Sequence, residues 1–245
     1  MKTTDFISLL ITPPRINGAY IASLARALES ADSNSFANPQ WIMYRIPHDK
    51  NASLDAIHEN NSKQTCKTTD IKSLLYDFTH TLAPFGKRLM LNPKSEKQIC
   101  SLLSLPFGGI HLKSYMLDSI PRIKTHIKSH SRHDSPRNHT RAITESTRDS
   151  ILLGYSAHSL DEVERALELG ADYCTLSPIF PTPHKSTPLG GLTYLDSIPV
   201  ALRPFIIALG GITAEAIPAI RSMGFLGFGA IGYFETALLA KKSYR

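Results

Sequence analysis

The segment from Leu152 to Leu176 constrains the fold of this chain more than any other part. Leu152–Tyr155 is an apolar run, and Asp172–Leu176 is a second one about twenty residues later. Between them Ser159 is suited to cap a helix, and Glu162 completes the capping-box pattern. Two strands joined by one helix form a βαβ unit with a parallel sheet. Because ligands of such sheets bind beyond the carboxyl ends of the strands, we expect the chemistry there.

The remainder of the chain alternates in the same way between short apolar runs and helical periodicity. The expected strands are 6–12, 40–46, 88–91, 109–112, 152–155, 172–176, 205–209 and 226–231. The expected helices are 20–29, 71–82, 95–103, 117–127, the segment after Ser159, 192–202, 214–223 and 235–241. Eight such units in 245 residues predict a single (β/α)8 TIM barrel domain spanning residues 1–245. A doubly wound open sheet is the alternative.

The positive charge of the chain is concentrated in one segment. Residues 121–148 contain seven basic and two acidic residues, which accounts for +5 of the net charge of +6. The rest is nearly neutral, so we expect no nucleic-acid partner. Residues 129–148 are also poor in apolar side chains, which predicts a mobile basic insertion between the fourth helix and the fifth strand. The histidines at 126, 130, 133 and 139 lack a regular framework, so we expect no metal site there.

The composition of the chain indicates the cellular compartment of the protein and the redox state of its cysteines. No run approaches the roughly 20 apolar residues that span a bilayer, and the N-terminal apolar run is too short for a secretory signal. Cys66, Cys100 and Cys174 are widely spaced, which favours reduced thiols over disulfides or a zinc site. We therefore expect a cytoplasmic protein with no membrane partner, and the sequence leaves open whether it forms a homo-oligomer.

Paired glycines follow the seventh and eighth expected strands. Gly210 and Gly211 close one strand, and Gly229 and Gly232 flank the end of the next. Barrels of this type often bind a phosphate group at these two strand ends, where glycine lets an anion approach the backbone closely. The alternative is that both sites are tight turns that need glycine for positive φ.

Three spaced motifs resemble the thiamine phosphate synthase/TenI superfamily. Gly154–His158 matches its G-x-S-x-H strand end, and Ser177–Lys185 resembles its G-P-x-F-x-T-x-x-K loop. Ala208–Ile212 matches its A-x-G-G-I phosphate turn. In the N-terminal half, Gly109–Leu112 is similar to the family's G-V-H-L strand. The resemblance therefore lies mainly in the C-terminal part of the chain.

The resemblance implies a barrel that binds a small-molecule thiazole phosphate. The phosphate would lie on the backbone at Gly210, Gly211, Ile231 and Gly232. Thr182 and Lys185 would face the substrate, with Lys185 as a fixed positive charge. Lys185 could instead be a solvated loop lysine.

The synthase branch of the family joins a pyrimidine diphosphate to the thiazole and uses magnesium on carboxylates. Pro93 stands where an N-D-R motif would supply one carboxylate, and Met116 stands where a G-Q-x-D pattern would supply the other. The pyrimidine-binding Q-x-R-x-K pattern is also eroded, leaving only Arg45 as a substrate-binding residue. These departures disfavour a synthase, although carboxylates elsewhere, such as Asp118, could restore a metal site.

The TenI branch is a thiazole tautomerase that needs neither metal nor pyrimidine. Its proton transfer requires one group that titrates near neutrality, and His158 lies where that branch carries its catalytic histidine. We therefore expect a thiazole tautomerase with His158 as catalytic residue and no cofactor. His158 could instead be only a hydrogen-bonded histidine at a strand end, as we expect for His111. Two alternatives stay open: a divergent magnesium-dependent thiamine phosphate synthase, and a non-catalytic regulatory protein that binds a thiamine intermediate.

Overall fold

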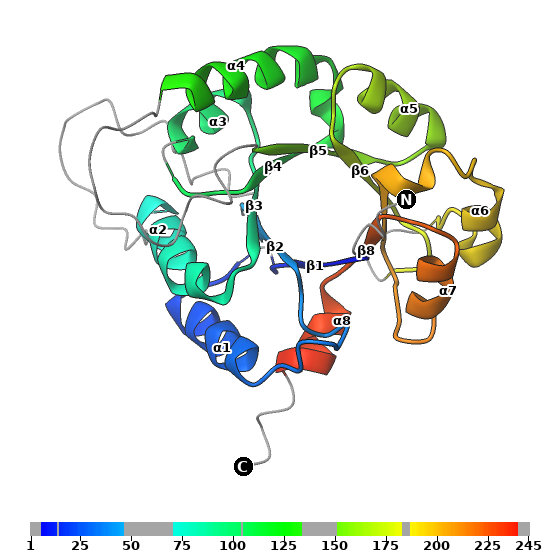
Figure 1. Cartoon of the computed structure of the whole chain (residues 1–245), viewed down its shortest axis with the longest axis horizontal. Coiled ribbons are helices and arrows are strands. Elements are labelled where there is room, and N and C mark those ends of the chain that lie inside the picture. The colour runs from blue at the N-terminus through cyan, green and yellow to red at the C-terminus, as the bar shows by residue number, and fades with distance from the viewer. Residues whose placement is uncertain are drawn as a thin grey trace.

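The computed structural model of the chain describes residues 6–13, 15–46, 71–103, 105–133, 151–182 and 187–239. Eight strands form a closed barrel in chain order, and every neighbouring pair is parallel. Figure 1 looks into this ring of strands, with the helices arranged around its outside. The predicted (β/α)8 barrel is confirmed, and the open-sheet alternative is wrong because β1 pairs with β8.

The strands lie where the apolar runs predicted them. They are β1 (Ile7–Ile11), β2 (Trp41–Arg45), β3 (Arg88–Asn92), β4 (Gly109–Leu112), β5 (Leu152–Ala157), β6 (Tyr173–Leu176), β7 (Ile206–Leu209) and β8 (Gly227–Ala230). The helices are α1 (Gly18–Glu29), α2 (Ile71–Leu82), α3 (Glu96–Leu102), α4 (Ile120–His133), α5 (Leu160–Glu168), α6 (Gly191–Ser197), α7 (Ile217–Ser222) and α8 (Gly232–Phe234). The 3-10 segments Ala83–Phe85, Ser114–Ser119 and Arg203–Phe205 precede β3, α4 and β7, and a π-helical segment, Glu235–Leu239, continues α8.

Two helices are shorter than the periodicity suggested, and proline explains both. Pro199 forces an extended conformation on Ile198, so α6 ends at Ser197 rather than at position 202. Pro218 occupies the first turn of α7, so this helix begins at Ile217.

The expected basic insertion is partly helical. Its first residues, 129–133, belong to α4, which extends beyond the predicted end at position 127. Residues 134–150 lie outside the described residues.

Two groups of apolar side chains follow from the alternation of strand residues. One group fills the inside of the barrel and contains Ile7, Leu9, Ile11, Met43, Met90, Tyr173 and Ile207. The other, larger group lies between the strands and the surrounding helices. Every second residue along each strand, counted from a member of the inner group, therefore points into the barrel. This includes residues at the carboxyl ends of the strands.

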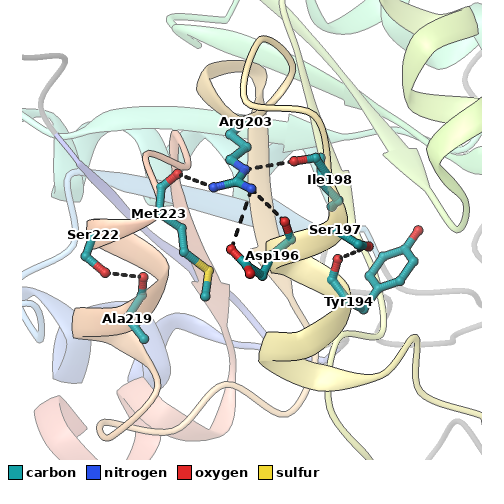
Figure 2. A network of polar contacts seen from close by, with 8 residues as sticks. All are labelled: Tyr194, Asp196, Ser197, Ile198, Arg203, Ala219, Ser222 and Met223. Atoms are coloured by element: carbon teal, nitrogen blue, oxygen red, sulfur yellow. Dashed lines mark hydrogen bonds and ion pairs between the residues drawn. The ribbon is translucent and has the colours of Figure 1, made fainter.

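Arg203 connects the loops at the amino ends of β7 and β8, which is the end of the barrel opposite the expected site. Its guanidinium donates to the carbonyl oxygens of Ile198, Asp196 and Met223 at 2.7–3.1 Å, as Figure 2 shows. It also lies over the ring of Phe225. This network stabilises the fold away from the site. No helix in the described part of the chain is long and apolar enough to cross a membrane.

Candidate active site

The carboxyl ends of all eight strands meet at one end of the barrel, here called the mouth, because the strands are parallel. At this end, the strand positions whose side chains point into the barrel carry mostly polar residues. They are Arg45 from β2, Asn92 from β3, Lys113 after β4, Ser156 from β5, His158 after β5 and Ser177 after β6. An apolar barrel interior thus ends in a polar layer, which is the arrangement expected of a binding site.

His158 is held in position from two sides. Its Nδ1 lies 2.7 Å from the carbonyl oxygen of Ser177, across the gap between the ends of β5 and β6. Its backbone N–H donates to the carboxylate of Glu162 at 2.8 Å, while the Ser159 hydroxyl accepts from the Glu162 N–H at the start of α5. The predicted capping box therefore exists, and Glu162 reaches back one residue further than the usual pattern to fix His158.

His111 lies one layer below, inside the barrel. Its two ring nitrogens contact the hydroxyls of Tyr173 and Ser156 at 3.0 Å, and that of Thr175 at 3.2 Å. Complete burial and the nearby charge of Lys113 lower the pKa of His111 to about 3, so the ring is neutral. Its role is structural, and it orients the Ser156 hydroxyl, which is half-buried at the mouth.

Gly210 and Gly211 have φ of +94° and +66°, conformations that disfavour other residues. A Cβ on Gly210 would lie 2.8 Å from the Cα of Pro178, and one on Gly211 would lie 2.6 Å from the carbonyl oxygen of Pro181. The loop after β6 packs directly on this turn, where Ile179 and Phe180 donate to Leu209 and Gly210. The tight-turn alternative therefore accounts for both glycines, whether or not a phosphate binds.

The turn after β8 differs. Gly232 has no positive φ, and a Cβ there would meet no atom within 4 Å. Ile231 accepts from the N–H groups of Phe234 and Glu235, which closes the first turn of α8. Within the described part of the chain, the N–H groups of Gly211 and Gly232 donate to no other residue. Packing against the described residues therefore does not account for the glycine at position 232.

Arg45, Asn92 and Lys113 form a second polar group, here called the cationic side. Arg45 and Asn92 are paired neighbours in the β2–β3 register, and the Asn92 amide donates to the carbonyl oxygen of His111 at 2.6 Å. The Lys113 ammonium donates to Asn92 Oδ1. Burial together with the charges of Arg45 and Lys94 lowers the pKa of Lys113 to about 8.

The barrel does not place all of the predicted substrate-binding residues next to one another. The closed strand order places Arg45 on β2 and the glycine turns on β7 and β8 in different parts of the ring. Thr182 is half-buried and directly follows Pro181, which packs on Gly211, so Thr182 lies beside the glycine turn. Lys185 falls outside the described residues.

The positions that could carry magnesium ligands do not fit a metal ion. Met116 is buried in the core between the strands and the helices, and Pro93 supplies no donor. Asp118 is exposed, and the described residues contain no group of three or more His, Cys, Asp or Glu side chains that could hold a metal. Lysine and arginine occupy this side of the mouth instead.

Sequence reasoning missed Asn92, Lys113 and Ser177 as site residues. Lys113 lies three residues before Met116, in a stretch that the sequence analysis considered only for its missing carboxylate. The spacing from His111 could have identified Lys113. Lys113 is two residues beyond the inward-facing His111, so the alternation of strand side chains directs it to the mouth.

Residues 126–232 match a family model described as TMP-TENI, thiamine monophosphate synthase. This segment of the chain is similar to thiamine monophosphate synthases. The matched segment contains β5 to β8 and therefore His158, Ser177 and both glycine turns.

Curated relatives are similar to part of the chain. The chain is 35% identical over 94 residues to a putative thiamine-phosphate synthase 2 of Aquifex aeolicus, covering 38% of this chain and 50% of that protein. It is 26% identical over 155 residues to the thiamine-phosphate synthase of Bacillus velezensis, covering 62% and 66%. The matches thus span half to two thirds of these relatives. The thiamine phosphate pyrophosphorylase structure from Pyrococcus furiosus shares the fold, with a TM-score of 0.55 at 16% identity over 98% of this chain and 90% of that chain.

Proposed function

We propose that this protein binds a thiazole phosphate and catalyses its tautomerisation, with His158 as acid and base. The observation that carries the proposal is the fixed imidazole of His158 at the mouth. A carbonyl oxygen can only accept, so the Ser177 contact requires a hydrogen on Nδ1. The neutral ring then has its basic lone pair on Nε2, which suits it to remove a proton from one carbon or nitrogen of the thiazole and return it to another.

The phosphate is proposed to bind on the β7–β8 side of the mouth. Backbone N–H groups of Gly211 and Gly232 would donate to its oxygens, and the open space at Gly232 would admit it. Thr182 and Lys185 are proposed to contact the same group from the loop after β6. Binding here would place the thiazole ring near His158, since β6 adjoins β7 and β5 adjoins β6 in the barrel.

Thiamine phosphate synthesis is the second candidate, because the relatives carry that name. It would require Mg²⁺ for the departing pyrophosphate. Pro93 and Met116 occupy the two positions where the family pattern has carboxylates, and the cationic side would repel the metal. The geometry therefore supports metal-free proton transfer better.

One pair of assays separates the candidates. We expect conversion of the thiazole carboxylate phosphate tautomer, followed by NMR, to proceed in EDTA. Incubation with pyrimidine diphosphate, thiazole phosphate and Mg²⁺ should release no pyrophosphate. Pyrophosphate release without tautomerisation would establish the synthase instead, and binding without either reaction would leave the regulatory alternative. We also propose that the protein acts in the cytoplasm as one domain without a cofactor.

A further inference from the structure

The partly buried ammonium of Lys113 has no negative partner among the described residues. It donates to the neutral amide oxygen of Asn92, and no carboxylate in the described ranges forms an ion pair with either Lys113 or Arg45. A partly buried cation beside like charges is costly, and such arrangements usually persist where a ligand supplies the opposite charge.

The surrounding contacts hold Asn92 and the loops after β3 and β4 in place. Asn92 is 5% exposed, and its amide is locked by the His111 carbonyl, so its Oδ1 faces Lys113 in one orientation. The Tyr115 hydroxyl donates to the Lys94 carbonyl at 2.8 Å, which joins the loops after β3 and β4. Ser119 and Arg122 both donate to Glu96, which joins the same two segments a second time. Asn92 and the loop that carries Lys113 are therefore preorganised.

The location determines which anion could reach the site. The cationic side lies on β2, β3 and β4, whereas the proposed phosphate turns lie on β7 and β8. A single ligand that spans the mouth would need an anionic group at each end. A thiazole phosphate with a carboxylate on the ring has this form, because the carboxylate and the phosphate arm leave the ring at different carbons.

We propose that Lys113 and Arg45, positioned by Asn92, bind the ring carboxylate of the thiazole substrate directly, at the place where a metal would require carboxylate ligands. This inference rests on the proposed function for the identity of the ligand, but the oxyanion site itself does not. Lysine and arginine would then select carboxylated thiazole phosphates over those that lack the carboxylate.

Calorimetric titration in EDTA, with thiazole phosphate carrying or lacking the ring carboxylate, tests the proposal. We expect the wild type to bind the carboxylated ligand roughly tenfold or more tightly than the other, as a charge-assisted contact allows. Lys113→Gln, which keeps a donor for Asn92, should abolish this preference and leave binding of the uncarboxylated ligand unchanged. Lys113→Arg should retain most of it. The control Lys128→Gln removes an exposed lysine of α4 and should change neither affinity.

Equal wild-type affinities for the two ligands, or a preference that survives Lys113→Gln, would overturn the proposal. Should neither thiazole bind, the proposed function fails, and titration with malonate tests the oxyanion site alone. Malonate binding that Lys113→Gln weakens roughly tenfold would still support the site, and binding independent of Lys113 would overturn it.

Discussion

The Nδ1 atom of His158 lies 2.7 Å from the carbonyl oxygen of Ser177. This contact joins the two strand ends that the βαβ unit was expected to bring together. It also fixes which ring nitrogen carries hydrogen, so the histidine has one defined basic atom. The same contact would hold the ring in place while Nε2 gains and loses a proton, which is the requirement for an acid and base that acts twice in one turnover.

Glu162→Gln tests whether the N-terminal turn of α5 positions His158. Glutamine keeps an acceptor for the His158 N–H but removes the charge at the helix N-terminus, so we expect a stability loss of about 0.5–1 kcal/mol and little loss of kcat. Glu162→Ala also removes the acceptor and should lower kcat severalfold more than Gln does, with KM nearly unchanged. Steady-state kinetics and urea denaturation measure both. Equal kcat values for the two variants would show that this hydrogen bond does not position the ring.

The two glycine turns should respond differently to alanine. Gly210→Ala combines a left-handed backbone with a clash against Pro178, so we expect a loss of at least about 2 kcal/mol of stability. Gly232→Ala meets open space and should leave the melting temperature nearly unchanged while weakening thiazole phosphate binding. Calorimetry and thermal denaturation distinguish these effects. Unaltered ligand affinity in Gly232→Ala would place the phosphate elsewhere.

The lowered pKa of Lys113 predicts that the free energy of unfolding depends on pH. Its pKa is lowered to about 8 in the folded protein, so between pH 8 and 10.5 the unfolded chain binds more protons and stability rises with pH. Relative to Lys113→Gln, the wild type should therefore gain up to about 2–3 kcal/mol over this range. Chemical denaturation across the range, without ligand, measures the difference between the two proteins. A constant difference would mean that the pKa of Lys113 is not lowered.

Binding of the carboxylated ligand should show the opposite trend. Only the protonated ammonium attracts a carboxylate, so affinity should fall above pH 8, by at most about tenfold per pH unit. Lys113→Arg should bind almost equally well at pH 7 and pH 10, since guanidinium stays charged. A parallel decline in both proteins would assign the pH effect to another group.

Arg203→Met should affect stability alone. The substitution removes the charged donors to Ile198, Asp196 and Met223, so we expect a loss of about 2–4 kcal/mol. The network lies at the amino ends of the strands, away from the mouth, so kcat and KM at a temperature where the variant is folded should match the wild type. A changed KM with unchanged stability would contradict this placement.

The fold was predictable because short apolar runs and helical periodicity alternate through most of the chain. The departures were local: Pro199 and Pro218 shortened two helices whose apolar spacing continued past them. His158 and the glycine turns could be found from motifs at strand ends. The carbonyl of Ser177 and the buried setting of Lys113 could not, because backbone acceptors have no sequence signature and burial depends on the closed barrel.

The most direct test of the account is His158→Asn, assayed for both binding and turnover of thiazole carboxylate phosphate. Asparagine can still donate to the Ser177 carbonyl but cannot exchange a proton near neutral pH. We predict that Kd changes less than about threefold while tautomerisation falls by roughly 10² or more. Tautomerisation at the wild-type rate in this variant would contradict the central claim.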